Sequence, residues 1–307
     1  MSAIIVATDV SRWYGEVVGL SGASLEVGTG VTGLLGPNGA GKSTLVRILS
    51  GQIRPSRGSV RVLGQPVWNN PRLFRRLGYC PEAEAIYESW SAREFLLAMA
   101  ALSGERGAPA ARRADEVLAI VGLDAGDRKP MGAYSKGMRQ RAKLAQALLH
   151  DPEVLLLDEP LNGMDPIGRK HTMDLITRLG AEGRTLLVSS HILHEIEAMT
   201  RTVALLDHGK VLAHGDVHEI REWIEDRAHS VRLRCSDPHR LAARLIELDD
   251  VAGVRFGSDA RVLIVETHRA DRFFARLTEL GRDRSLGLEE VLPLDDDLQS
   301  VFNYLVR

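Results

Sequence analysis

The stretch GPNGAGKST, residues 36–44, has the residue types and spacing of a phosphate-binding loop. Its glycines let the backbone turn tightly and bring N–H groups against phosphate oxygens, because no Cβ stands in the way. Lys42 supplies a positive charge for the outer phosphates, and the hydroxyl of Ser43 is a ligand for Mg²⁺. The sequence therefore predicts a site for a nucleoside triphosphate. The loop residues expected to contact it are Gly36, Pro37, Asn38, Gly39, Ala40, Gly41, Lys42, Ser43 and Thr44.

Two carboxylates, Asp158 and Glu159, follow the apolar run VLLL at residues 154–157. Such a run predicts a buried strand, and in a parallel sheet its carboxyl end lies near the phosphate loop. Because neighbouring residues of a strand point to opposite sides, the two carboxylates should have different tasks. We expect Asp158 to hold Mg²⁺ through water and Glu159 to act as general base on the attacking water.

A scaffold of alternating strands and helices is predicted to hold these groups. Strands are expected at residues 4–10, 23–27, 31–35, 58–63, 77–80, 154–157 and 185–189, with a hairpin of residues 203–206 and 210–213. One helix should follow the phosphate loop directly, and others should begin near Ser91, Ser135 and Leu193. Residues 104–111 are expected to be a loop before a helix at residues 114–121. This alternation predicts an α/β fold with a mainly parallel sheet.

The C-terminal part of the chain is predicted to form a second, smaller domain. A charged helical stretch marks the boundary, which divides the chain into residues 1–224 and 225–307. The predicted elements after it follow the order strand, helix, strand, strand, helix, strand, which is typical of a ferredoxin-like α+β fold. This part contains no catalytic group of residues that we can identify, so we assign the chemistry to the first domain.

Composition places the chain among ordinary globular proteins. A formal net charge of −2 gives no indication that nucleic acid is a partner. Cys80 and Cys235 lack the spacing of a zinc site, and we expect buried thiols in a reducing compartment. No apolar run is long enough to cross a bilayer, and the first residues lack the pattern of a signal peptide. We therefore expect a cytoplasmic protein that reaches a membrane only through a partner.

Residues 134–141, YSKGMRQR, resemble the signature of the ATP-binding cassette (ABC) family, usually written LSGGQ. Ser135 and Gly137 match that core, and the remaining core positions depart from it. Signatures of the YSKGM type are, however, typical of the export-related branch with a detached ATPase chain. The resemblance covers roughly residues 1–220, with every motif in the family's order. It implies a P-loop NTPase fold in which a RecA-like core carries a helical subdomain.

The resemblance also implies roles for single residues. Tyr14 is expected to stack on the adenine, with its neighbour Trp13 as the rival. Asp165 lies in a loop expected to cross a dimer interface and contact ATP. His191 corresponds to the family's switch histidine, whereas a metal site built on His191 and His194 lacks a third ligand. The expected catalytic residues are Glu159, His191 and Lys42.

Glu82 departs from the family pattern, which has a glutamine after the strand at residues 77–80. A carboxylate can still bind Mg²⁺ and face the nucleotide, but it adds negative charge beside the γ-phosphate. We expect Glu82→Gln to change ATPase activity by no more than about one order of magnitude, or roughly 1.4 kcal/mol. The expected magnesium ligands are Ser43, Asp158 and Glu82.

In this family two cassettes join head to tail, so that each ATP lies between the phosphate loop of one chain and the signature of the other. For this chain the resemblance implies a second ATP-binding chain, expected to be another copy, and a transmembrane permease. Tyr87 and Trp90 are candidates to receive a helix of the permease, and packing within the helical subdomain explains them equally well. The expected location is the cytoplasmic face of the plasma membrane.

The leading hypothesis is therefore the ATP-hydrolysing subunit of a two-component exporter, with ATP and Mg²⁺ as its ligands. The alternative is a soluble ABC ATPase, for example one of cofactor assembly. DNA-repair types carry a long coiled coil and translation types carry two cassettes, and this sequence has neither. A regulator that hardly hydrolyses is disfavoured because the residues expected to support hydrolysis are all present, namely Lys42, Asp158, Glu159 and His191. The transported substrate is recognised by the permease and cannot be inferred from this chain.

Overall fold

The computed structural model describes residues 3–83, 86–222, 229–283 and 286–294. The chain divides into two compact units, Met1–Asp216 and Val217–Arg307, and each is described by itself. The domain boundary predicted between residues 224 and 225 falls within residues 223–228, outside the described residues. None of the helices in the described ranges is long and apolar enough to cross a membrane.

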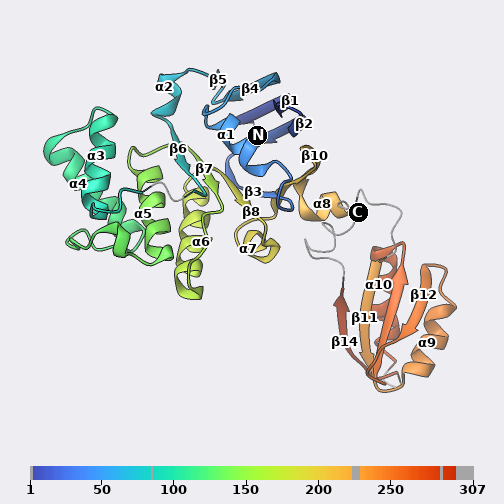
Figure 1. Cartoon of the computed structure of the whole chain (residues 1–307). Coiled ribbons are helices and arrows are strands. Elements are labelled where there is room, and N and C mark those ends of the chain that lie inside the picture. The colour runs from blue at the N-terminus through green and yellow to red at the C-terminus, as the bar shows by residue number, and fades with distance from the viewer. Residues whose placement is uncertain (1–2, 84–85, 223–228, 284–285, 295–307) are drawn as a thin grey trace. The chain divides into compact units, whose positions relative to one another are not determined.

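A mainly parallel sheet of six strands forms the centre of the first unit (Figure 1). Its strand order is β10-β9-β3-β8-β7-β6, and every neighbouring pair is parallel except the β9–β10 hairpin. The strands are β3 (Gly30–Leu35), β6 (Leu77–Cys80), β7 (Val154–Asp158), β8 (Thr185–Ser190), β9 (Thr202–Asp207) and β10 (Lys210–Asp216). The predicted α/β class and its mainly parallel sheet are confirmed. Every residue of β7 and β8 is buried, as expected for central strands of a parallel sheet covered on both faces.

A second sheet of the same unit is wholly antiparallel, in the order β2-β1-β4-β5. Its strands are β1 (Ile5–Tyr14), β2 (Val17–Val27), β4 (Arg57–Val62) and β5 (Gln65–Pro66). The sequence predicted shorter first strands and did not separate this sheet from the parallel one. Pairing between segments about 50 residues apart, as between β1 and β4, leaves no local pattern in the chain.

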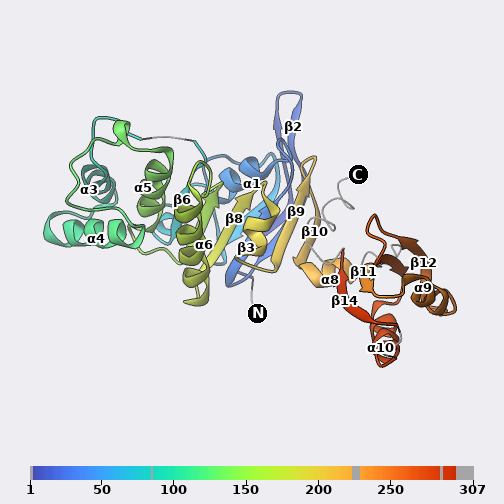
Figure 2. The same cartoon turned by 90° about the horizontal axis from the view of Figure 1, so that it is seen from below.

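Helix α1 (Lys42–Leu49) lies between the two sheets (Figures 1 and 2). Its buried side chains, among them Leu45 and Leu49, belong to one hydrophobic core with residues of both sheets. Helices α6 (Pro166–Ala181) and α7 (Leu193–Glu197) pack on the other face of the parallel sheet. Gly180 of α6 approaches so closely that an added Cβ would stand 2.7 Å from the side chain of Val31.

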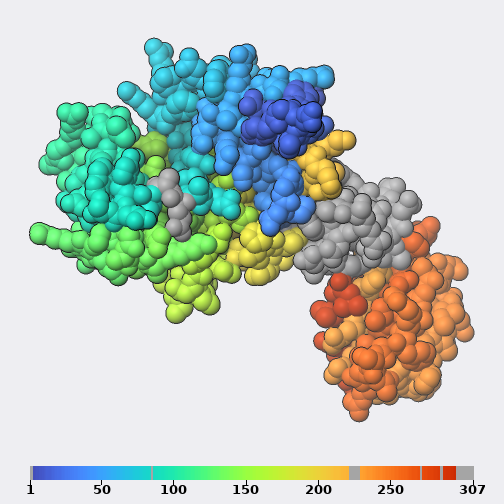
Figure 3. Space-filling model, in the orientation of Figure 1, coloured from blue at the N-terminus to red at the C-terminus, as the bar shows by residue number. Residues whose placement is uncertain are grey.

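The helices α3, α4 and α5 form a lobe at one end of this unit, shown in green and teal in Figure 3. Between α1 and α6 the helical elements are α2 (Pro71–Phe74), α3 (Ala92–Leu102), α4 (Gly107–Ile120), the 3-10 turn η1 (Met131–Ala133) and α5 (Lys136–Leu148). The predicted capping box at the start of α3 is present, with Ser91 Oγ accepting from the Glu94 N–H at 3.3 Å. Ser135 caps α5 by accepting from the Met138 N–H at 3.2 Å, so the predicted start of that helix is confirmed.

Two helix predictions need correction. Residues 104–111 are not all loop, because α4 begins at Gly107; Pro109 falls in its first turn, where no backbone donor is needed. The sequence analysis also missed α6 altogether, although its start is marked by Asp165, which caps Gly168 N–H at 2.8 Å, and by Pro166 at the first helical position.

The second unit contains the predicted order of elements. After α8 (Val217–Glu222) come β11 (His229–Cys235), α9 (Pro238–Ile246), β12 (Val251–Phe256), β13 (Val262–Thr267), α10 (Ala270–Leu280) and β14 (Leu288–Pro293). The four strands form an antiparallel sheet in the order β12-β13-β11-β14. Apolar residues of α9 and α10, such as Leu241 and Phe273, pack with Leu233 and Val265 of the sheet in a separate core. This is the strand order of a ferredoxin-like fold.

Candidate active site

The phosphate-binding loop connects β3 to α1 and turns through two glycines in the left-handed region, Gly39 at φ +84° and Gly41 at φ +105°. A side chain at Gly41 would also collide with the backbone, since an added Cβ would lie 2.5 Å from the carbonyl oxygen of Gly19. The loop therefore needs glycine at these positions for both conformation and space. Because α1 begins at Lys42, unpaired N–H groups at its start face the same side as the loop.

Lys42 is buried, and its Nζ donates to the carbonyl oxygens of Gly36 (2.7 Å) and Pro37 (3.2 Å). Burial lowers the pKa of this ammonium, and the negative charges of Glu159, Asp158 and Glu82 offset part of that effect. The cation therefore faces a group of carboxylates across the site, where it can neutralise added phosphate charge.

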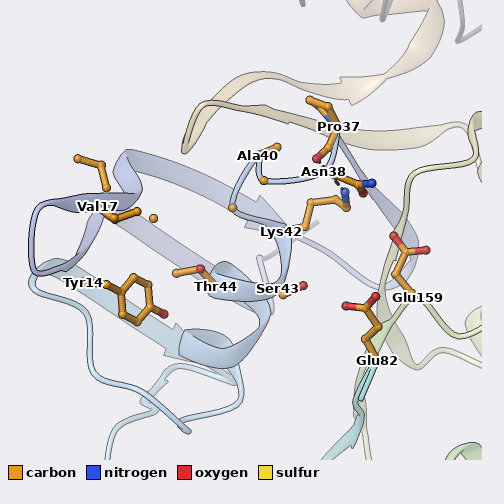
Figure 4. Close-up of a pocket in the computed structure, with 14 residues that line it drawn as sticks. Tyr14, Val17, Pro37, Asn38, Ala40, Lys42, Ser43, Thr44, Glu82 and Glu159 are labelled. Atoms are coloured by element: carbon orange, nitrogen blue, oxygen red, sulfur yellow. Dashed lines mark hydrogen bonds between the residues drawn. The ribbon is translucent and has the colours of Figure 1, made fainter. Parts of the chain in front are cut away.

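A cavity of about 350 Å³ lies in front of the loop (Figure 4). It is lined by Tyr14, Val17, Val18, Gly19, Pro37, Asn38, Gly39, Ala40, Gly41, Lys42, Ser43, Thr44, Glu82 and Glu159. Most of the predicted loop residues thus face one cavity. Gly36 lies behind the loop, where an added Cβ would stand 2.1 Å from the carbonyl oxygen of Leu206.

Tyr14 stands at the end of the cavity away from the carboxylates (Figure 4). Its ring rests on Gly19, where an added Cβ would approach Cε2 to 2.9 Å, and the Arg12 guanidinium lies 4.9 Å from the ring centroid. The residue as a whole is 41% exposed and lines the cavity, so its side chain can be reached by a ligand. Its rival Trp13 is not among the described residues that line the cavity.

Asp158 is the last residue of β7, Glu159 follows it and lines the cavity opposite the loop, and a buried serine of the neighbouring strand β8 holds both. Ser189 Oγ donates to Asp158 Oδ1 at 2.6 Å and accepts from the Glu159 N–H at 2.9 Å. Glu159 adopts φ +48°, an uncommon conformation for a residue with a side chain. Asp158 is only 2% exposed and, unlike Glu159, is not among the described residues that line the cavity.

Glu159 is paired with His191, whose Nδ1 lies 2.9 Å from Glu159 Oε2. Burial raises the pKa of the Glu159 carboxyl; its hydrogen bond and charge interaction with His191 lower it in part, and the charge of Glu82 raises it further. A carboxylate of raised basicity, oriented by a histidine and facing a phosphate loop, has the properties of a general base toward water.

Glu82 lies in the loop after β6 and points into the cavity from the same side as Glu159 (Figure 4). The carboxylates of Glu82 and Glu159 and the hydroxyl of Ser43 on the loop side are hard oxygen ligands of the kind that Mg²⁺ prefers. Only one or two protein ligands are needed when a nucleotide's phosphates supply others, so this donor set fits the ion. Over the described ranges, no group of three or more His, Cys, Asp or Glu side chains could hold a metal alone.

Ser135, Gly137 and Asp165 lie away from the cavity in the described part of this chain. Gly137 packs against the segment before α6, since an added Cβ would lie 3.3 Å from Met164 Cα. In the same region Lys136 Nζ donates to Asn162 Oδ1 at 3.3 Å. The signature residues and the Asp165 segment therefore neighbour each other, apart from the phosphate loop of their own chain.

Several residues of the site were missed by the sequence analysis. Ser189 was predicted only as the end of a strand. Its position is a usable signal, because a serine at the end of one apolar parallel strand can reach the Asp-Glu pair at the end of the next. Glu195 of α7 is 3% exposed; it accepts from Ser190 Oγ at 3.2 Å and pairs with Arg169 of α6 at 3.0 Å. These contacts fix the start of α7, just after His191, against the helix that follows Asp165.

Known proteins of similar sequence and structure agree on a family. A family model described as ABC transporter matches residues 20–162. The chain is 34% identical over 309 residues to the bacitracin transport ATP-binding protein BcrA of Bacillus licheniformis, covering 100% of this chain and 98% of that protein. It is 33% identical over 281 residues to the daunorubicin/doxorubicin resistance ATP-binding protein DrrA of Streptomyces peucetius, covering 91% and 85%. A solved ATP-binding subunit of an ABC transporter superposes with a TM-score of 0.66 at 28% identity, over 72% of this chain and 93% of that one.

Proposed function

The chain belongs to the family of ABC transporter ATP-binding proteins, whose members hydrolyse ATP, and we propose that it powers export through a separate transmembrane permease. The relatives named for bacitracin transport and for daunorubicin resistance support a transport role over the soluble alternative. The observation that carries the ATP-hydrolysing part of the proposal is Glu159, which lines the cavity opposite the phosphate loop and is paired with His191.

We propose a role in ATP hydrolysis for each group of residues along the cavity. Tyr14 stacks on the adenine, the loop N–H groups and Lys42 hold the β- and γ-phosphates, and Glu159 accepts a proton from the water that attacks the γ-phosphate. His191 keeps the carboxylate of Glu159 oriented through the 2.9 Å hydrogen bond. Mg²⁺ would be held by Ser43 and Glu82, with Asp158 acting through water, and would neutralise charge on the phosphates.

A second copy of the chain would complete the site. Ser135 caps the first turn of α5, and this helix start, where Ser135 and Lys136 are exposed, carries a partial positive charge. Placed against the γ-phosphate bound by another copy, this helix start would stabilise the charge of the transferring phosphoryl group. Loss of the γ-phosphate after hydrolysis would remove that contact and release the copies, an ATP-driven cycle of closing and opening.

The permease would bind at the surface near Glu82 and the start of α3. Tyr87 and Trp90 stack there with ring centroids 4.5 Å apart, and Tyr87 is 52% exposed. The ring of Tyr87 also lies 6.2 Å from that of Phe95, which is buried in α3, so part of this cluster packs within the lobe. The exposed part offers a platform for a short helix of the permease and would place the chain at the cytoplasmic face of the plasma membrane.

The test is a pull-down of tagged Glu159→Gln protein from detergent-solubilised native membranes in the presence of ATP. The substitution keeps the shape of the side chain but removes the base, so bound ATP should persist and hold the copies closed. We expect a polytopic membrane protein to be recovered, and its sequence would narrow the substrate. The matched control is the same protein with ADP. Recovery of soluble partners alone, with no membrane-bound pool of the wild type, would contradict the exporter proposal.

A further inference from the structure

Lys143, on the buried face of α5, is 1% exposed and was not singled out by any sequence pattern. Its Nζ donates to three consecutive carbonyl oxygens, those of Pro81 (2.8 Å), Glu82 (2.9 Å) and Ala83 (3.3 Å). Burying an ammonium is costly unless its three N–H groups find acceptors, and the loop supplies three. The loop therefore supplies hydrogen-bond acceptors for the buried ammonium of Lys143, and the ammonium in turn holds the loop.

The three carbonyls belong to the loop that carries Glu82 into the cavity (Figure 4). This loop leaves β6 at Cys80, and its residues 81–83 lie in neither helix nor strand. A cation that gathers three successive carbonyls fixes the orientation of the intervening peptide planes. Those planes set the direction of the Cα–Cβ bond of Glu82, and therefore the side of the loop from which its carboxylate extends.

The same face of α5 also reaches the other carboxylate of the cavity wall. Gln140, one helical turn before Lys143, donates through Nε2 to the carbonyl oxygen of Glu159 at 3.3 Å. The helix that carries both side chains begins at the Ser135 cap. One rigid element thus connects the signature to the backbones of Glu159 and Glu82, through an amide and an ammonium respectively.

We propose that Lys143 is a positioning residue for Glu82, holding its loop so that the carboxylate faces the metal and γ-phosphate, and coupling that position to the signature helix. The inference rests on the proposed role of Glu82 in the nucleotide site. It predicts that the ammonium acts on turnover and on the metal dependence of turnover, whereas the affinity for nucleotide, provided by the phosphate loop, stays unchanged.

The experiment compares Lys143→Met with Glu82→Ala and the double variant in the full-length chain. Methionine keeps the length of the buried side chain but donates no hydrogen bond. We expect Lys143→Met to lower kcat about tenfold and to raise the Mg²⁺ concentration for half-maximal activity, with metal-free binding of a fluorescent ATP analogue within about twofold of wild type. In the Glu82→Ala background, the further loss on adding Lys143→Met should be less than about twofold, because the effect passes through Glu82.

The matched control is Lys170→Met, which removes a lysine that is 72% exposed on α6 and paired only at the surface with Asp174. It should behave as wild type. Full multiplication of the two losses in the double variant, or an unchanged kcat in Lys143→Met, would overturn the inference. If Lys143→Met does not fold, Lys143→Gln is used instead, since glutamine retains two donors. It must lower kcat and raise the Mg²⁺ requirement by less than Lys143→Met would, again with nucleotide binding unchanged. A Glu82→Ala variant with unaltered turnover and metal dependence would instead refute the proposed role of Glu82 itself.

Discussion

Substitution of Ser189 by alanine should disturb Asp158 and Glu159 at once. The lost hydroxyl donates to Asp158 at 2.6 Å and accepts from the Glu159 N–H at 2.9 Å. Leaving the buried carboxylate without its donor costs about 1.5–3 kcal/mol, and leaving the N–H unsatisfied costs about 1–3 kcal/mol. Partial relaxation recovers some of this sum, so we expect a loss of about 2–4 kcal/mol in the free energy of unfolding. For a unit of this size that is a fall of about 4–16 °C in Tm.

The same substitution should lower kcat for ATP hydrolysis by about 10- to 100-fold, because Glu159 is held at φ +48° partly by the lost bond and its carboxylate would shift. The assays are thermal unfolding without nucleotide and steady-state ATPase measurement. The control is Ser103→Ala, which removes an exposed hydroxyl bonded to the carbonyl of Met99 at 3.3 Å. A Ser189→Ala protein with a Tm within 2 °C and kcat within about twofold of wild type would refute this account of Ser189.

Three further outcomes are expected. Glu82→Gln should keep ATPase activity within about tenfold and move the acid limb of the kcat–pH profile to lower pH. The charge of Glu82 raises the pKa of Glu159, which must be ionised to act as a base, so without that charge Glu159 stays ionised to lower pH. An acid limb that moves to higher pH would contradict this. Tyr14→Ala should raise the KM for ATP by about 2- to 10-fold, while Trp13→Ala leaves it unchanged; the reverse result would make Trp13 the stacking residue. Burial raises the pKa of Cys80 to about 12, so this thiol should resist Ellman's reagent at neutral pH until the chain is unfolded, and rapid labelling of the native protein at that position would show that the strand is accessible.

The parts of the site that came from the sequence are those written in contiguous residues. The phosphate loop needs glycine at fixed positions, and the Asp158–Glu159 pair follows a run of buried strand residues, so both appear as local patterns. The parallel sheet followed from the alternation of strands and helices. The helix starts at Ser91 and Ser135 followed from capping chemistry within a single turn.

The parts that the sequence did not provide depend on segments far apart in the chain. Lys143 meets the carbonyl of Pro81 across 62 residues, and Ser189 meets Asp158 across 31. Nothing local distinguishes such a lysine from one on a solvated helix face, because its acceptors are backbone carbonyls of another element. The separate antiparallel sheet was missed for the same reason. The start of α6, in contrast, had local signals at Asp165 and Pro166 that were available and not used.

The central claim is that each ATP site is completed by a second copy of the chain. Sedimentation velocity of Glu159→Gln protein, with binding of ATP confirmed in the same sample, tests it most directly. We predict a dimer with ATP and Mg²⁺, a monomer with ADP, and a monomer with ATP when Ser135→Arg is added to block the start of α5. A monomer throughout, with the cavity saturated by ATP, or a dimer that ignores both the nucleotide and Ser135→Arg, would contradict the shared site.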